Sequence, residues 1–141
     1  LNVEALLDDA DDRRWVGIAP ESDIGHMHLH VSDLAKAEAF YADVAGFDVV
    51  VRGYPGALFV AAGGYHHHIG LNVWAGKQSP PPGVVGLIEY SVIVPEAAGF
   101  AALWERLQTA GSVVEIGENY VIASDQDGNA VRFQREAAAL K

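Results

Sequence analysis

All six histidines of this sequence fall in two short runs, and they supply most of the chemistry available to it. The first run is IGHMHLHV, residues 24–31, in which histidine alternates with apolar residues. Side chains of a strand point alternately to its two faces, so this pattern predicts a strand with His26, His28 and His30 on one face. Imidazoles grouped in this way bind metal ions or transfer protons near neutral pH.

The second run, His66-His67-His68, begins a segment that we expect to form a strand over residues 65–74. Here alternation divides the three imidazoles. His67 falls with the more apolar set, which we expect beneath a helix, whereas His66 and His68 fall with Asn72 and Trp74 on the other face. We therefore predict that His66 and His68 join the histidines of the first strand, and that Asn72 and Trp74 line the same cavity.

The elements around these runs repeat along the chain. The order strand, helix, strand, strand, strand occurs once over residues 24–74 and again over 86–135, and two helix-ending glycines, Gly46 and Gly111, lie 65 positions apart. We predict an α+β fold in which two βαβββ modules, related by a pseudo-two-fold axis, form a cup-shaped mixed β-sheet with the helices outside.

The predicted organisation is a single domain over 24–135, with two modules and two flanking segments. The proline-rich stretch 75–85 reads as the linker between the modules. Residues 1–23 are expected to hold a short amphipathic helix over 3–14 followed by a loop, and 136–141 to form a tail.

The repeat brings two further side chains to the histidines. His26 and Glu89 are 63 positions apart, and His68 and Arg132 are 64 apart, so each pair occupies equivalent strands. If a pseudo-two-fold axis relates the modules, these four side chains should meet near it. We also expect Glu89 and Arg132 to lie within ion-pair reach, because their charges are opposite.

Two histidines and one carboxylate form the ligand set that suits non-haem Fe(II), and His26, His68 and Glu89 supply it. Zn, Mn and Ni are alternatives. Arg132 cannot ligate a metal, because its guanidinium is always charged. It could bind an anionic oxygen of a ligand, or pair with Glu89 and withdraw the carboxylate from the site, so a site without metal remains an alternative.

Composition restricts the partners. Among 141 residues, 9 are Lys or Arg and 19 are Asp or Glu, which gives a net charge of −10. Nucleic acids and anionic membranes would repel such a chain. Cysteine is absent and no apolar run is long enough to cross a membrane, so we expect a cytoplasmic protein.

Three segments together resemble the vicinal oxygen chelate (VOC) superfamily of glyoxalases, bleomycin-resistance proteins and extradiol dioxygenases. They are GHMHLHVSDLAKAEAFYADVAGF, GALFVAAGGYHHHIGLNVW and DQDGNAVRF. The similarity is closest to the second half of two-half, catechol-2,3-dioxygenase-like proteins. It implies a metal-centred cup in which His26 is a metal ligand and His68 an acid–base residue. Extradiol members carry His at position 89 and Glu at position 132, and both are changed here.

The resemblance implies two alternative functions. The first is a metal-dependent extradiol-type enzyme, or half of one, acting on a small aromatic or vicinal-oxygen substrate with His68 as its catalytic residue. The second is a non-catalytic protein that sequesters an aromatic ligand or drug, contacted by His28, His66, Asn72, Trp74 and Arg132. The implied partners are the small molecule and either a second copy, in a homodimer, or a missing companion VOC half.

Overall fold

The computed structural model describes residues 2–9, 17–79, 81 and 83–135. Its first module contains four strands in the order β1-β4-β3-β2. They are β1 (Met27–His30), β2 (Asp48–Val51), β3 (Ala57–Ala61) and β4 (Ile69–Asn72). β1 runs parallel to β4, and the other neighbours are antiparallel.

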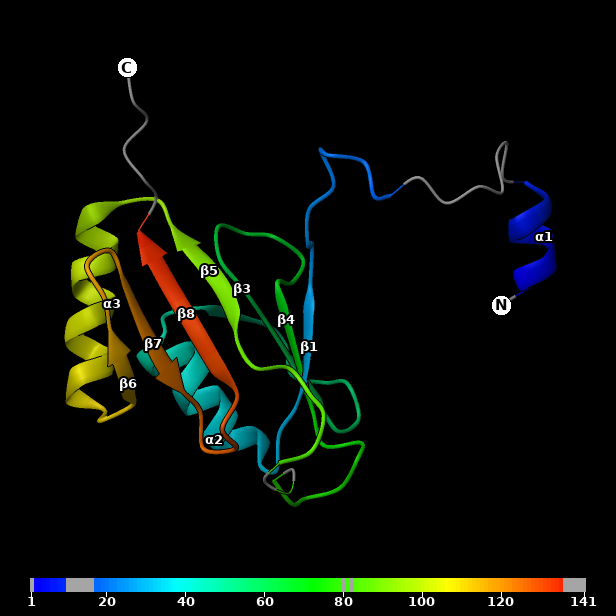
Figure 1. Ribbon diagram of the computed structural model, residues 1–141. Helices are drawn as coiled ribbons and strands as arrows, with labels where there is room; N and C mark the ends of the chain where they lie inside the picture. Colours follow the sequence, from blue (N-terminus) through cyan, green and yellow to red (C-terminus); the bar gives the residue numbers. More distant parts are fainter. Residues whose placement is uncertain (1, 10–16, 80, 82, 136–141) are drawn as a thin grey trace.

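The second module repeats this arrangement with the order β5-β8-β7-β6. Its strands are β5 (Tyr90–Val94), β6 (Val113–Ile116), β7 (Tyr120–Ser124) and β8 (Ala130–Arg135). β5 is parallel to β8, and the remaining pairs are antiparallel. The predicted α+β fold with two βαβββ modules is therefore confirmed. The strands hydrogen-bond as two separate sheets, which lie side by side in Figure 1.

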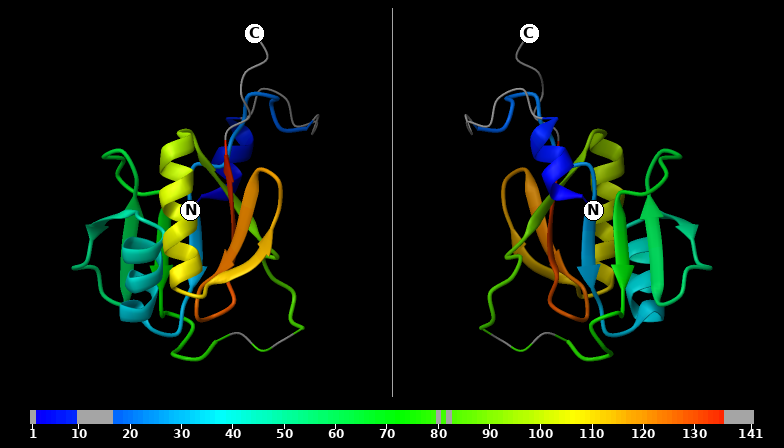
Figure 2. Two further views of the ribbon diagram at one scale, coloured as in Figure 1. Left: turned by 90° about the vertical axis from the view of Figure 1, so that its left-hand side faces the viewer. Right: turned by 90° about the vertical axis from the view of Figure 1, so that its right-hand side faces the viewer.

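One helical segment packs on each sheet. In the first module α2 (Leu34–Glu38) continues into the π-helical turn η1 (Ala39–Val44), and Asp33 caps the start by accepting hydrogen bonds from two backbone N–H groups. In the second module α3 (Ala97–Thr109) contacts β5 and β8. The two helical segments also contact each other and lie next to one another in Figure 2.

Strands β5 and β8 alternate between more and less buried residues, and the helix-facing residues of both sheets form one core shared by the two modules. Leu29 and Leu71 of the first sheet and Val131 and Phe133 of the second are all at most 4% exposed. Burying these side chains against the helices sets which face of each sheet stays open. His28 and Gly70 lie on the open face of the first sheet, because their strand neighbours are in the core.

The turn between β7 and β8 joins the modules. Asp125, which is 7% exposed, accepts a hydrogen bond from the Tyr41 hydroxyl at 3.2 Å. Asp127 accepts from the backbone N–H of Ser32 at 2.8 Å, and the Asn129 amide donates to the carbonyl of His30 at 3.1 Å. The second module is thus hydrogen-bonded to the end of β1 and to η1. These bonds fix the orientation of one sheet relative to the other, and with it the orientation of their open faces.

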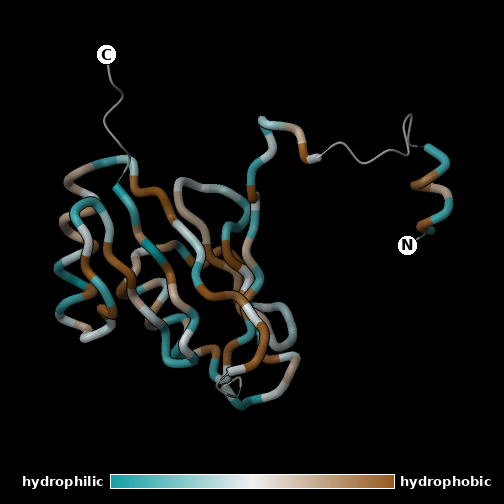
Figure 3. The backbone as a smooth tube through the Cα atoms, in the orientation of Figure 1, coloured by the Kyte–Doolittle hydropathy of each residue, from teal (hydrophilic) through white to brown (hydrophobic). Residues whose placement is uncertain are grey.

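In the described part of the N-terminal segment, the helix α1 spans Val3–Asp8, whereas the predicted helix spanned 3–14. Residues 10–14 of that prediction, and the tail 136–141, lie outside the described residues. Figure 3 shows mixed hydropathy along α1, and its apolar residues Val3, Leu6 and Leu7 are each more than half exposed. Within the described ranges, no helix is both long and apolar enough to cross a membrane.

Candidate metal and ligand site

Three imidazoles gather beside the open face of the first sheet. They belong to His26, just before β1, and to His66 and His67, just before β4, and one ring nitrogen from each lies within 4.8 Å of the others. His26 Nδ1 and His67 Nε2 are 2.8 Å apart and share a hydrogen bond. We call these three residues the histidine group.

The prediction for His67 was wrong. His67 was expected beneath the helix, but its ring centroid lies 4.3 Å from that of His26 and 5.6 Å from that of His28, while His68 is outside the histidine group. The reason is that β4 begins only at Ile69, so residues 65–68 do not continue its alternation. Gly63 and Gly64, both with positive φ, turn the chain just before this segment.

The surroundings of His67 favour an uncharged imidazole. Desolvation lowers the pKa of His67 below its usual value, and repulsion from His26 and His66 lowers this pKa further. A metal-ligating histidine must be neutral. The environment of His67 therefore favours the neutral form that a metal ligand needs.

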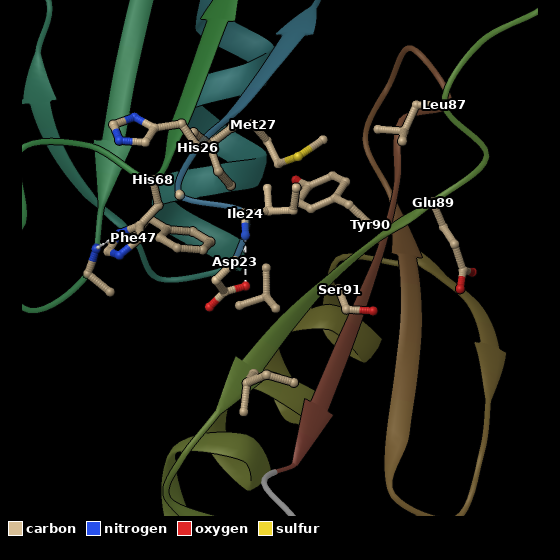
Figure 4. Close-up of a pocket in the computed structure, with 15 residues that line it drawn as sticks. Asp23, Ile24, His26, Met27, Phe47, His68, Leu87, Glu89, Tyr90 and Ser91 are labelled. Atoms are coloured by element: carbon tan, nitrogen blue, oxygen red, sulfur yellow. Dashed lines mark hydrogen bonds between the residues drawn. The ribbon is translucent and has the colours of Figure 1, made fainter. Parts of the chain in front are cut away.

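His68 lies outside the histidine group and, together with His26, lines a cavity of about 760 Å³ between the two modules. Its Nδ1 accepts a hydrogen bond from the backbone N–H of Ala62 at 3.2 Å. The proton of the neutral ring is then on Nε2, which can act as a donor. Figure 4 shows His26 and His68 on one wall of this cavity and Leu87, Glu89 and Ser91 on the other.

Glu89 and Arg132 form the predicted ion pair, with 2.7 Å between Arg132 Nε and Glu89 Oε1. The guanidinium also lies 4.0 Å over the Tyr120 ring. Glu89 and Tyr120 together raise the pKa of Arg132, so its charge is permanent. Because the two side chains remain 33% and 22% exposed, the pair is less buried than a core ion pair.

The three predicted metal ligands, His26, His68 and Glu89, all line this cavity, but the group of possible metal ligands among the described residues does not include His68 or Glu89. In Figure 4 the Glu89 carboxylate points away from His26 and His68. Among the described residues, the group that could hold a metal is the histidine group, which keeps only His26 of the predicted set. Because the Glu89 carboxylate is paired with Arg132, as expected, it does not join the histidines as a metal ligand.

The remaining predicted ligand residues lie along the open face. His28 packs so closely on Gly70 that a Cβ at residue 70 would be 2.7 Å from its ring. Asn72 accepts a hydrogen bond from the Trp74 backbone N–H at 3.3 Å, and Trp74 itself is 58% exposed. The structure adds two residues that sequence reasoning missed, Tyr54 and Phe59. Phe59 pairs with Gly70 across β3 and β4, so strand alternation along 57–61 could have found it.

Paired βαβββ modules with a histidine group beside one open sheet face are the arrangement expected above for the VOC superfamily. Comparison with known families supports this assignment. The family model of the Glyoxalase/Bleomycin resistance protein/Dioxygenase superfamily matches residues 23–133. The chain therefore belongs to this superfamily.

Among curated proteins, a catechol-2,3-dioxygenase of Bacillus subtilis (strain 168) is 48% identical over 123 residues. The match covers 84% of this chain and 43% of that protein. The chain thus spans less than half the length of this relative.

Solved structures share the fold at lower identity. A lactoylglutathione lyase from Agrobacterium tumefaciens has a TM-score of 0.61 and 22% identity, covering 84% of this chain and 96% of its own. Glyoxalase I of Leishmania major has a TM-score of 0.62 and 16% identity, covering 82% and 88%. At such identities the likeness shows the fold alone.

Proposed function

We propose that this chain is a metal-dependent, extradiol dioxygenase-like protein, or half of one, that acts on a small aromatic or vicinal-oxygen substrate. The observation that carries the proposal is the histidine group, in which three imidazole nitrogens lie within 4.8 Å of one another. The similarity to a catechol-2,3-dioxygenase supports the reaction class.

The residues have separate roles in this proposal. His26, His66 and His67 would hold a divalent metal, and the metal would supply Lewis acidity toward vicinal oxygen atoms of the substrate. His68 remains our proposed acid–base residue, because its Nε2 carries a proton and the residue lines the cavity between the modules. Asn72 and Trp74 would border the ligand on the open face.

Two observations bear on the identity of the metal. The dioxygenase relative favours Fe(II). An all-imidazole set also suits Zn and Ni, whereas Mn prefers oxygen ligands and fits less well. We therefore propose Fe(II) first, with Zn and Ni as the principal alternatives.

Metal titration tests the proposal. We expect purified protein, freed of metal by chelation, to bind about one equivalent of Fe(II) under anaerobic conditions in isothermal titration calorimetry. His26→Ala and His67→Ala should weaken binding at least tenfold. His30→Ala is the matched control, since its imidazole bonds to the Gln78 carbonyl instead. Equal affinity in all four proteins would contradict the metal site.

The second candidate function is a ligand-binding protein without turnover. It is favoured by the 2.7 Å contact between Arg132 and Glu89, which occupies the carboxylate that a facial metal site would need. Oxygen uptake separates the two functions. An enzyme should consume oxygen when the iron-loaded protein is mixed with catechol, whereas a sequestering protein should bind catechol without oxygen uptake.

We also propose that a second VOC domain, either a companion half or a second copy, covers the mouth of the cavity. Ile24 and Leu87, which line the cavity, are 76% and 56% exposed, and Ile88, next to Leu87 in the chain, is 88% exposed. Apolar patches of this kind mark interaction surfaces, and the chain spans only 43% of its dioxygenase relative. If a second copy covers the cavity, sedimentation velocity should show a dimer that Ile88→Asp dissociates. Val114→Asp, the control, should leave that dimer intact. A monomeric parent protein would rule out the second copy and favour a companion half as the partner.

A further inference from the structure

Beyond the histidine group, the open face of the first module carries three aromatic side chains, Tyr54, Phe59 and Trp74, which we call the aromatic ledge. The ring centroids of Tyr54 and Trp74 are 6.0 Å apart, and those of Tyr54 and Phe59 are 6.1 Å apart. Tyr54 is 55% exposed and Trp74 58% exposed. Two large aromatic rings thus lie together with more than half of their surfaces uncovered.

The ledge is held in place before any ligand arrives. Trp74 Nε1 donates a hydrogen bond to the carbonyl of Pro55 at 3.0 Å. Gly56 has a φ of +71°, and a Cβ there would lie 3.2 Å from the indole. The turn can therefore approach Trp74 closely because residue 56 is glycine. A preformed surface loses little conformational freedom when it binds a ligand.

The ledge is continuous with the histidine group. The Phe59 ring lies 5.0 Å from that of His67 and 6.0 Å from that of His28, centroid to centroid. The rings of His67, Phe59, Tyr54 and Trp74 thus follow one another at centroid spacings of 5.0, 6.1 and 6.0 Å, each about the width of one aromatic ring. A single-ring ligand at the histidine group would therefore leave Tyr54 and Trp74 uncovered, and a ligand that touches both must extend by a further ring.

We propose that the aromatic ledge is a second subsite, which binds a distal aromatic ring or flat apolar substituent of the ligand. Exposed aromatic rings bind other rings in offset or edge-to-face contacts and need no ionic partner. The position of the first ring rests on the function proposed above. The affinity of the ledge for a second ring does not depend on metal.

Matched probes test the ledge in metal-free protein. Catechol and 4-phenylcatechol differ by one aromatic ring, and 4-cyclohexylcatechol replaces that ring with a saturated one of similar bulk. We expect the full chain, in excess chelator, to bind 4-phenylcatechol about tenfold more tightly than catechol in calorimetric titrations. The cyclohexyl compound should bind more weakly than the phenyl compound.

Variants of the ledge should reduce this preference. Tyr54→Leu, a mild surface substitution, should lower the preference for 4-phenylcatechol several-fold and leave the affinity for catechol unchanged, and Trp74→Ala should lower the same preference. Trp104→Phe, a tryptophan change on α3, is the control. If Trp74→Ala fails to fold, as judged by its thermal transition, Tyr54→Leu alone decides.

The outcomes separate this inference from the metal site. His67→Ala should weaken metal binding at least tenfold yet keep the preference for 4-phenylcatechol in chelator. Loss of metal binding in the parent would refute only the proposed function. An unchanged preference in Tyr54→Leu, or equal affinity for the phenyl and cyclohexyl compounds, would overturn the ledge as an aromatic subsite.

Discussion

Replacing Tyr41 with phenylalanine tests the contact that holds the two modules together. Tyr41 is fully buried on η1, and its hydroxyl donates to the carboxylate of Asp125 in the turn between β7 and β8. Burial, with smaller contributions from Tyr90 and Asp125, raises the pKa of Tyr41 above its usual value. The hydroxyl therefore keeps its proton and remains a donor over the whole range in which the protein is folded.

The size of the effect follows from what remains after the change. A hydrogen bond to a charged group contributes about 1.5–3 kcal/mol. The 3.2 Å separation is long, and Asp125 keeps three donors, the backbone N–H groups of Asp127 and Asn129 and the Asn129 amide. We therefore expect Tyr41→Phe to lower the free energy of unfolding by about 1.5 kcal/mol, at the lower end of that range.

Chemical and thermal unfolding measure this difference. For a chain of this length, 1.5 kcal/mol corresponds to a fall in Tm of roughly 5 °C. Tyr120→Phe is the matched control, because its hydroxyl bonds to Glu115 at the surface, where a substitution changes stability by less than about 0.5 kcal/mol. Asp125→Ala should lower the free energy of unfolding more than Tyr41→Phe does, since it leaves several hydrogen-bond donors without their acceptor. Equal losses in the two tyrosine variants would refute the assignment of Asp125 as the joint between modules.

Three further predictions concern the site itself. The pKa of His67 is lowered by folding, so the unfolded chain binds protons more readily than the folded one below about pH 6.5; stability should therefore fall as the pH drops from 7 to 5, and His67→Asn should flatten that slope in urea titrations. Gly70→Ala should push the His28 ring off the open face, because the new Cβ would lie 2.7 Å from that ring. A shifted NMR signal of the His28 imidazole with an unchanged Tm would support this, and an unshifted signal would contradict it. Arg132→Ala should free the Glu89 carboxylate beside the cavity. We therefore expect this variant to bind Zn²⁺ more tightly than the parent in calorimetric titrations. An unchanged affinity for Zn²⁺ would show that Glu89 does not reach the metal.

Much of the fold could be predicted because the signals are local. Alternating apolar residues, glycines at the helix ends and the repeat of about 64 residues give the order of elements in both modules. The offsets made Glu89 the counterpart of His26 and Arg132 that of His68, so the two opposite charges were expected near each other, and the structure places them 2.7 Å apart. Equivalent strands of a repeated module occupy equivalent places, so this contact follows from sequence spacing without knowledge of any side-chain packing.

The composition of the histidine group could not be predicted in this way. The sequence determined that six imidazoles flank two neighbouring strands, but strand alternation assigned His68 to the group, and the structure brings His67 there. Alternation holds only while the backbone stays extended and paired, and residues 65–68 precede the strand. Likewise, Tyr54, Phe59 and Trp74 come from three separate segments. Their meeting depends on how the chain turns at Gly56 and pairs β3 with β4, and these long-range contacts exist only in the folded protein.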